Sequence, residues 1–221
     1  MTIEETKQTM VDVFRAMYHQ NMLTLFEGNV SMRWGDHLLI SPSQKNKETM
    51  TKEMIIETDF DGNVISAMDG CRPSSEFKMH REVYRLRPDI QAAVHCHSPF
   101  ATAFAVAGKE LAPEGVAEIN LLFGKVPLAR YGRTGSEDIY KDFAELFEEY
   151  DSVLLENHGI LCTGKTIEMA LARAETIEKT AKIMFISHIL GGEKPLPPEE
   201  VNFLREVGGK MRKKARGIEN K

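Results

Sequence analysis

The sequence contains no apolar run long enough to span a membrane, and its N-terminus lacks the basic and then apolar pattern of a signal peptide. Its three cysteines, Cys71, Cys96 and Cys162, are an odd number without the spacing of a disulfide framework, which predicts free thiols in a reducing compartment. A formal net charge of −5 leaves no basic surplus for nucleic acid. These absences predict a cytoplasmic protein that binds neither a membrane nor nucleic acid.

Internal repeats and a linker between domains are also missing. A chain of 221 residues can bury one sizeable core, so a single domain over 1–221 is expected. Its C-terminal helix should begin near 199 and run into a basic tail, 210–216, which we expect to be a solvated helix face or a frayed end.

Local patterns predict a mixture of helices and strands. Thr2 and Glu5 fit a capping box that opens a helix ending near Asn21, and Gly35-Asp36 fits the turn of a hairpin. The same reasoning predicts a hairpin over 55–66, a helix over 136–150 and a long helix capped by Thr166. The segment 111–125 has no strong periodicity, so it is expected to be a loop, a lid or a subunit contact.

Two histidines follow a buried apolar stretch near the middle of the chain. Ile90 to Val94 is typical of a buried strand, and strand alternation then places His95 and His97 on one face. Two neutral imidazoles facing one point supply half of a first-row metal site, for which zinc is the first candidate. The pair is weak evidence by itself, because a His-x-His pattern is often incidental.

Two further stretches can complete such a site. Glu76 opens a helix predicted to run to Leu86, and the serine pair before it can cap that helix or bind an anion. His158 lies between two predicted strands, where Gly159 is expected to let the backbone bend so that the imidazole points inward. His80, in contrast, lies within an apolar helical stripe and is expected to be a core or helix-face residue.

Two loops near the start of the chain contain small polar residues. They are Gly28-Asn29-Val30-Ser31 and Ser41-Pro42-Ser43-Gln44. Each fits ordinary turn chemistry, and each also fits a cradle of backbone N–H groups and hydroxyls for an oxyanion.

In this order the motifs resemble those of the class II aldolase and adducin family, of the L-fuculose-phosphate aldolase and ribulose-phosphate epimerase type. The resemblance covers roughly residues 5–190, and five stretches carry it: 28–31, 41–43, 73–76, 95–98 and 156–159. It implies an α/β fold of three layers, αβα, with a mainly antiparallel central sheet. It also implies a homotetramer with active sites at the subunit interfaces.

The resemblance implies roles for individual residues as well. A divalent metal, Zn²⁺ first and Mn²⁺ or Co²⁺ as alternatives, would be bound by Glu76, His95, His97 and His158. Glu76 would also transfer protons during turnover. The phosphate of a sugar phosphate would be bound by Gly28, Asn29, Ser43, Gln44, Ser74 and Ser75.

The sequence departs from the family pattern at several positions. Gln44 stands where a glycine is usual, and no tyrosine lies between 101 and 130, where aldolases of this type use one from a neighbouring subunit. Asn120 falls near the place of an epimerase aspartate. Glu118 is therefore the best candidate for a second proton-transfer residue, with Tyr131 and Tyr140 as alternatives.

Three functions stay open on this basis. The first is an aldolase that cleaves a (deoxy)ketose 1-phosphate, such as L-fuculose 1-phosphate or 5-deoxyribulose 1-phosphate, to dihydroxyacetone phosphate and an aldehyde through a metal-stabilised enediolate. The second is a sugar-acid phosphate decarboxylase, a methylthioribulose-phosphate dehydratase or a ribulose-phosphate 4-epimerase on the same site. The third is a non-catalytic adducin-like assembly module, against which the intact set of three histidines and a glutamate argues.

Overall fold

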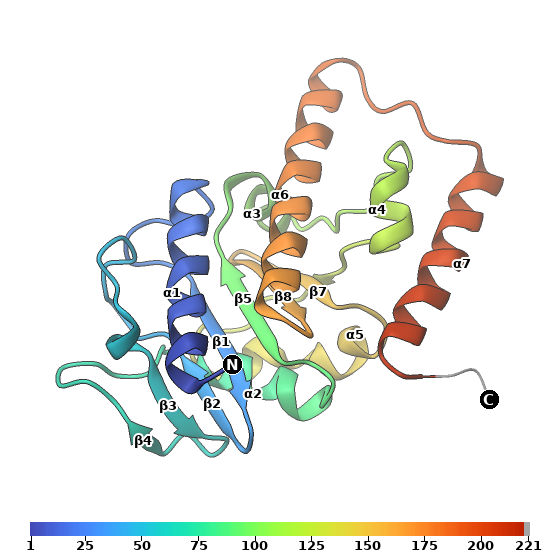
Figure 1. Cartoon of the computed structure of the whole chain (residues 1–221). Helices are drawn as coiled ribbons and strands as arrows, with labels where there is room; N and C mark the ends of the chain where they lie inside the picture. Colours follow the sequence, from blue (N-terminus) through green and yellow to red (C-terminus); the bar gives the residue numbers. More distant parts are fainter. Residues whose placement is uncertain (219–221) are drawn as a thin grey trace.

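The computed structural model describes residues 1–218, so the last three positions of the expected domain lie outside the described residues. Its centre is an eight-stranded sheet in the order β4-β3-β2-β1-β5-β8-β7-β6 (Figure 1). Neighbouring strands are antiparallel except for the parallel pair β6 and β7, which confirms the expected mainly antiparallel sheet. The strands are β1 (Asn29–Trp34), β2 (His37–Ile40), β3 (Ile56–Asp59), β4 (Val64–Ser66), β5 (Ala92–Cys96), β6 (Leu128–Ala129), β7 (Ser152–Leu155) and β8 (Gly159–Gly164).

Helices cover both faces of this sheet. One apolar cluster joins the sheet to α1, α3 and α6, and a second joins its other face to α2 and α5, which confirms the expected three layers. No helix among residues 1–218 is both long and apolar enough to cross a membrane. The helices are α1 (Ile3–His19), η1 (Lys52–Met54), α2 (Phe77–Leu86), α3 (Pro99–Val106), α4 (Ala117–Leu122), η2 (Glu137–Tyr140), α5 (Phe143–Glu149), α6 (Ile167–Ile189) and α7 (Pro198–Ala215).

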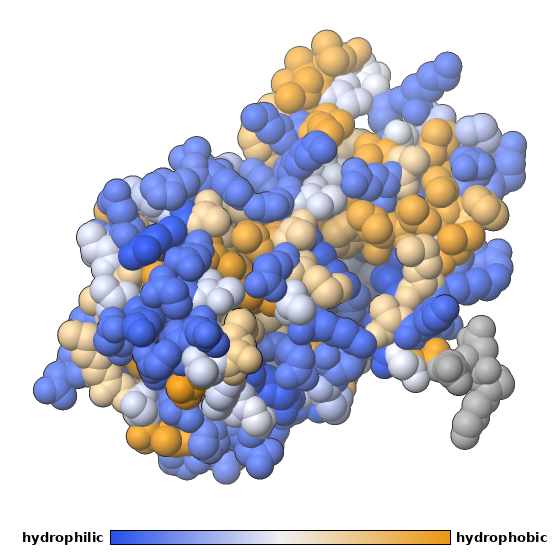
Figure 2. Space-filling view, in the orientation of Figure 1, coloured by the Kyte–Doolittle hydropathy of each residue, from blue (hydrophilic) through white to orange (hydrophobic). Residues whose placement is uncertain are grey.

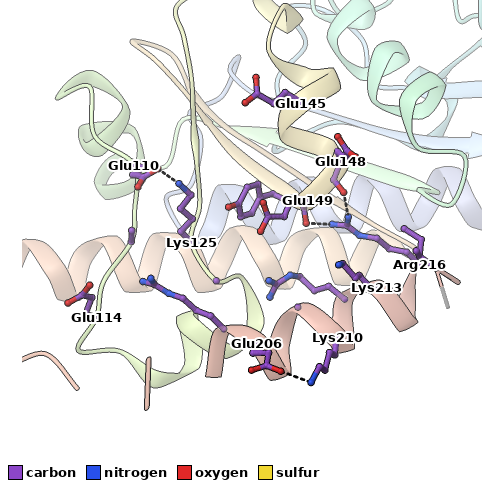
Figure 3. A pocket seen from close by; sticks show the side chains of 17 residues that line it. Glu110, Glu114, Lys125, Glu145, Glu148, Glu149, Glu206, Lys210, Lys213 and Arg216 are labelled. Atoms are coloured by element: carbon purple, nitrogen blue, oxygen red, sulfur yellow. Dashed lines mark hydrogen bonds and ion pairs between the residues drawn. The ribbon is translucent and has the colours of Figure 1, made fainter. Parts of the chain in front are cut away.

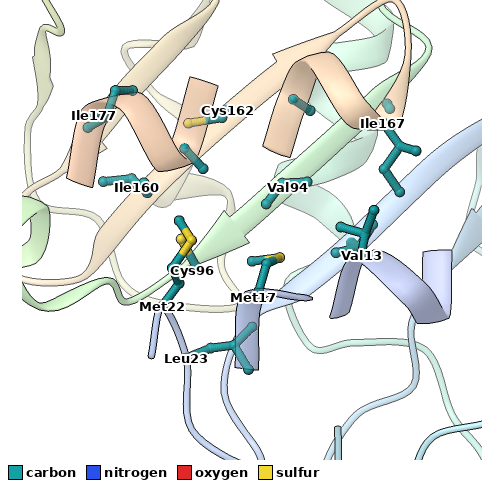
Figure 4. Close-up of a cluster of buried hydrophobic side chains, with 14 of the residues drawn as sticks. Val13, Met17, Met22, Leu23, Val94, Cys96, Ile160, Cys162, Ile167 and Ile177 are labelled. Atoms are coloured by element: carbon teal, nitrogen blue, oxygen red, sulfur yellow. The ribbon is translucent and has the colours of Figure 1, made fainter. Parts of the chain in front are cut away.

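The central strand β5 divides its side chains between the two faces. Val94 and Cys96 pack into the first cluster, against Val13 of α1 and Ile177 of α6 (Figure 4). Since side chains alternate along a strand, His95 projects from the opposite face, toward α2. The sheet therefore holds one metal-ligand candidate rigidly while its other face is committed to the core.

The local signals at several element ends are confirmed. Thr2 and Glu5 form both hydrogen bonds of the capping box, and Thr166 accepts a hydrogen bond from the Met169 amide. Helix α1 ends at His19, and Asn21 follows with a φ of 57° in the left-handed region. Both expected hairpins form, as β1–β2 and β3–β4.

Two segments in the middle of the chain differ from the expected secondary structure. The segment 111–125 contains the helix α4, which was missed because six residues are too few to show periodicity. The helix expected over 136–150 is divided into η2 and α5. The break lies at Lys141 and Asp142, whose side chains bond outward to the Tyr131 carbonyl and to Arg130.

The basic tail is not simply solvated. Arg216 donates to the carbonyls of Glu148 and Glu149 at 2.7 and 2.6 Å, at the end of α5, and Arg212 donates to the carbonyls of Leu121 and Leu122 at 3.2 Å (Figure 3). Carbonyls at a helix C-terminus lack intrahelical partners and carry partial negative charge, so they attract guanidinium groups. The tail is thus docked on α4 and α5 by two arginines, while Lys210 and Lys213 stay exposed.

A hollow of about 1100 Å³ lies between this tail and α5 (Figure 3). Charged side chains of both signs line it, and several are paired, for example Lys125 with Glu110 and Lys210 with Glu206. None of the site residues expected from the sequence lines it.

Candidate metal centre

Three imidazoles meet at one end of β5 and β8. His95 lies near the end of β5, His97 follows that strand, and His158 lies in the turn between β7 and β8. One ring nitrogen from each lies within 4.8 Å of the other two, and the Nε2 atoms of His95 and His97 are 3.0 Å apart. The structure therefore brings together three side chains that are up to 63 positions apart in the sequence (158 − 95).

Glu76 closes the group. Its Oε2 lies 3.1 Å from Nε2 of His95, and its Oε1 lies 3.0 Å from Nε2 of His158. Despite this proximity, Glu76 Oε1 has no hydrogen-bond partner among the described residues. All four candidate metal ligands predicted from the sequence thus converge on one point.

These groups fit a divalent cation. His95 Nδ1 lies 2.8 Å from the carbonyl oxygen of Ile160, which only accepts, so Nδ1 carries the proton and Nε2 presents a lone pair to the cluster. Tetrahedral zinc with bonds of about 2.0–2.1 Å separates its ligand atoms by about 3.3 Å, close to the contacts around Glu76. Nitrogen and oxygen donors of this kind suit zinc and related first-row metals.

Burial and neighbouring charge set the protonation of the cluster. Burial favours the neutral acid, but His95 and His158 hold the pKa of Glu76 far below its ordinary value. Burial and the adjacent histidines lower the pKa of His97 to about 4, which keeps its lone pair free. Burial opposes protonation of His95, but Glu76 raises its pKa on balance. A cation would compete with that proton for the same lone pair.

Glycines and a left-handed asparagine allow the close approach. The bend before His158 lies at Asn157, with a φ of 56°, so the expectation that Gly159 supplies it was wrong. A Cβ on Gly159 would instead lie 2.5 Å from the Cys96 carbonyl, so glycine is needed where β8 meets β5. Gly28 has the same effect beside the His95 carbonyl, with a φ of 71° and a Cβ contact of 2.9 Å.

Two of the segments expected to bind phosphate, the loop 41–44 and the segment 72–75 before α2, are joined to each other. Ser43 N–H donates to the Arg72 carbonyl at 2.9 Å, and Ser74 N–H donates to the Ser41 carbonyl at 3.2 Å. Ser74 Oγ accepts from the Glu76 amide at 3.3 Å, within a turn that precedes α2, so it links this cradle to the metal centre and does not cap the helix. Ser75 stays exposed at the surface of the cradle.

Gln44, where the resemblance to the family leads us to expect glycine, has a left-handed backbone conformation. Its φ is 54°, in the left-handed region that glycine adopts without cost. Its side chain is exposed, and its Oε1 accepts from Arg72 at 3.2 Å. Gln44 and Arg72 therefore form a polar pair at the rim of the expected phosphate cradle.

Comparison with known proteins agrees with this site. The family model described as "Class II Aldolase and Adducin N-terminal domain" matches residues 8–185. The chain belongs to the class II aldolase and adducin family. Membership implies a lyase, and class II aldolases depend on a metal, for which the three histidines are the candidate site.

Relatives with different reactions are about equally similar. An L-fuculose phosphate aldolase of Methanococcus maripaludis is 32% identical over 81% of this chain and 96% of its own. A 5-deoxy-D-ribulose 1-phosphate aldolase of Bacillus thuringiensis is 32% identical over 92% and 95%. A 3-oxo-tetronate 4-phosphate decarboxylase of Pectobacterium atrosepticum is 31% identical over 83% and 85%. Among solved structures, an L-fuculose 1-phosphate aldolase superposes with a TM-score of 0.84 at 28% identity, over 94% of this chain and 96% of its own.

The residues expected to transfer a second proton are not bonded to the candidate metal centre among residues 1–218. Glu118 is exposed on α4, Tyr131 is 53% exposed, and Tyr140 packs against Phe143. Among the described residues, none of these three side chains has a hydrogen bond or ion pair to Glu76 or the histidines. Asn120 is fully buried and bonds to Arg205 and to nearby carbonyls, so its role here is structural.

Sequence reasoning missed the residues that support the site. His80 was expected in the core, and it is buried there, but it also bonds to Asn29 and Ser31. Its position one helical turn after Glu76 was the available signal, because residues four apart share a helix face. Glu178 of α6 accepts from the first amides of α3, and its spacing gave no signal at all.

Proposed function

We propose that this chain is a metal-dependent aldolase that cleaves a (deoxy)ketose 1-phosphate to dihydroxyacetone phosphate and an aldehyde. The observation that carries the proposal is the convergence of three imidazoles on Glu76, beside a cradle formed by 41–44 and 72–75. L-Fuculose 1-phosphate and 5-deoxyribulose 1-phosphate are the first substrates to consider, since relatives with those printed names match most of the chain.

The reaction breaks the bond between the third and fourth carbons. The hydroxyl on the fourth carbon loses its proton to a base and becomes the aldehyde carbonyl. The electron pair of the broken bond stays on the third carbon as part of an enediolate, and that carbon then takes up a proton to give dihydroxyacetone phosphate. Zn²⁺, or Mn²⁺ or Co²⁺ in its place, would supply Lewis-acid stabilisation of the developing negative charge when bound to His95, His97 and His158.

The side chains of this protein would transfer the proton and bind the phosphate. The Glu76 carboxylate lies 3.1 Å from His95 Nε2 and 3.0 Å from His158 Nε2, so it would accept a proton beside the metal and return it to the third carbon. Ser43, Ser74 and Ser75, with the amides near Gly28, would bind the phosphate and fix the distance of the reacting carbons from Glu76. Asn29 and Gln44 would complete that cradle.

A second copy of the chain would complete the site. We propose a cytoplasmic homotetramer of single-domain subunits, in which Glu118 of a neighbour is the candidate second proton-transfer group. Its exposure on α4 supports this. Figure 2 shows apolar side chains gathered at the end of α6, and they are exposed: Ile183, Phe185, Ile186, Ile189 and Leu190.

A decarboxylase is the second candidate. Loss of carbon dioxide from a 3-oxo acid also leaves an enediolate or enolate, but it needs no base to deprotonate a hydroxyl. The decarboxylase relative, 31% identical over 83% of this chain, supports this alternative.

A coupled assay on protein of known metal content tests the proposal. Both ketose 1-phosphates are supplied, and dihydroxyacetone phosphate is measured with and without a chelator. We expect chelator-sensitive release. No release by protein that carries about one metal per subunit would contradict the aldolase, and carbon dioxide release from a 3-oxo-tetronate 4-phosphate would then support the decarboxylase.

Two variants locate the chemistry within that assay. Glu76→Gln should fold and lower kcat by about 10²–10⁴, since proton transfer is lost. Ser75→Ala should mainly raise KM for the phosphorylated substrate, because it removes a hydroxyl from the cradle. Full activity of Glu76→Gln would exclude its proposed role.

A further inference from the structure

Four buried side chains extend inward from Glu76 in a single line of hydrogen bonds. Asn29 Nδ2 lies 2.7 Å from Glu76 Oε2, and Asn29 Oδ1 contacts His80 Nε2. His80 Nδ1 lies 2.6 Å from Ser31 Oγ, which lies 2.9 Å from the Tyr84 hydroxyl. The line crosses between β1 and α2, because Asn29 and Ser31 share one strand face while Glu76, His80 and Tyr84 are spaced by one helical turn.

The direction of each bond follows from the donors and acceptors available. An ionised Glu76 only accepts, so the Asn29 NH₂ group faces it and the Asn29 oxygen must accept from His80 Nε2–H. A neutral imidazole with a proton on Nε2 accepts at Nδ1, so Ser31 O–H donates there. His80 is fully buried, which disfavours a charged ring.

The far end of the line is closed. With the Ser31 O–H committed to His80, the single proton of the Tyr84 hydroxyl is shared between Ser31 Oγ and the Ser31 carbonyl, each 2.9 Å away, and a carbonyl cannot pass a proton on. His80 and Ser31 are fully buried, and Tyr84 is 1% exposed. The line therefore offers no route by which a proton from Glu76 reaches solvent, and its fixed direction serves orientation.

We propose that His80 is a positioning residue, which fixes the Asn29 amide so that one N–H holds Glu76 Oε2 and the other stays available to the substrate. The proposal rests on the proposed function of Glu76 and Asn29. A flipped amide would present its oxygen to the Glu76 carboxylate, and two acceptors in contact repel. His80 prevents this, because its Nε2–H can bond only to the oxygen of Asn29.

Substitutions at His80 separate positioning from packing. His80→Gln can keep an N–H donor near the place of Nε2, whereas His80→Leu fills similar space without one. With both proteins saturated with metal, we expect His80→Leu to lower kcat by roughly 10- to 100-fold, as losses of such supporting partners do, and His80→Gln to stay within about threefold of the unmodified protein. Equal losses in both variants would overturn the proposal.

Tyr84→Phe is the matched control at the closed end. It removes a buried hydroxyl from the same line and should lower stability, but kcat should be unchanged because Ser31 can still donate to His80. A loss of kcat in Tyr84→Phe as large as that in His80→Leu would mean that the activity follows stability and would contradict positioning.

The tautomer of His80 provides a readout that does not depend on activity. Nitrogen-15 NMR of the metal-loaded full chain, with His80→Gln to assign the signal, should show a neutral ring with its proton on Nε2. A proton on Nδ1 would reverse every bond in the line and overturn the inference. If the unmodified protein cleaves no ketose phosphate, the proposed function fails, and this measurement still decides the arrangement around Glu76.

Discussion

Two clusters in this molecule each surround one carboxylate with three basic side chains, but only one of them is arranged for a metal. Asp151 lies 3.1, 2.8 and 2.8 Å from the guanidinium groups of Arg87, Arg173 and Arg216. Each of these contacts has an N–H between nitrogen and oxygen, so the donors and acceptors match. The cluster joins α6 and α7 to the start of β7, and both Asp151 oxygens accept from guanidinium groups.

The cluster around Glu76 does not match in this way. The Nε2 atoms of His95 and His97 are 3.0 Å apart, and His95 already donates through Nδ1, so its Nε2 faces the cluster with a lone pair. The His158 Nδ1 and the Glu76 Oε1 atoms have no hydrogen-bond partners among the described residues. A carboxylate among basic side chains at similar distances is thus a structural ion cluster in one place and a candidate metal centre in the other, and the lone pairs of the imidazoles distinguish the second.

Removal of one imidazole should have the largest effect. We expect His95→Ala to lose bound metal and activity together, with a fall in kcat/KM of at least about 100-fold, because Lewis-acid stabilisation is worth several kcal/mol and each 1.36 kcal/mol is tenfold. Metal analysis and the coupled assay measure the two losses. His188→Ala, an exposed histidine at the end of α6, is the control and should change neither. Full metal content in His95→Ala would contradict the assignment.

Removal of the other carboxylate should affect stability and leave the metal in place. Asp151→Asn leaves three mostly buried arginines without their common anion, so we expect the free energy of unfolding to fall by about 3–5 kcal/mol. Urea unfolding measures this, and metal content should stay the same. Glu206→Gln removes an exposed partner of Lys210 and should have no measurable effect. A loss of metal in Asp151→Asn without a loss of stability would remove the distinction between the clusters.

The sequence predicted much of the Glu76 cluster because short motifs carry it. His95 lies near the end of a strand and His97 follows it two residues later, and Glu76 precedes a helix with a clear apolar stripe, so local spacing placed each side chain. The sheet and its hairpins were predictable for the same reason, since alternation and turn residues are local signals.

The Asp151 cluster and the C-terminal docking were not predictable in this way. Arg216 lies 65 positions from Asp151 (216 − 151), and in the sequence it looks like part of an ordinary basic tail. Helix α4 is too short to show a period, and the Gly208 that lets α7 approach the Leu121 carbonyl is inconspicuous. Pairing of distant charges depends on the finished fold, and no local pattern reports it.

A third carboxylate, Glu178, belongs to neither cluster, and its substitution should have the smallest effect. Its oxygens accept from the Phe100 and Ala101 amides at 3.1 and 2.9 Å, at the N-terminus of the helix that follows His97. In the same helix, the Ala105 carbonyl accepts a hydrogen bond from the amide of Asn157, the residue before His158. Glu178 therefore supports two imidazoles through one short helix, by backbone contacts alone.

We expect Glu178→Gln to weaken metal binding by about tenfold, since supporting partners of metal ligands act on this scale, and to cost about 1–2 kcal/mol of stability through the weakened helix cap. Competition with a chromogenic chelator measures the affinity, and urea unfolding measures the stability. Glu175→Gln, one turn earlier on α6 and bonded to Gln20, is the matched control and should leave metal affinity unchanged. Equal metal affinity in both variants would mean that His97 and His158 keep their positions without the Glu178 cap on α3. The metal centre would then depend on the strands β5 and β8 alone.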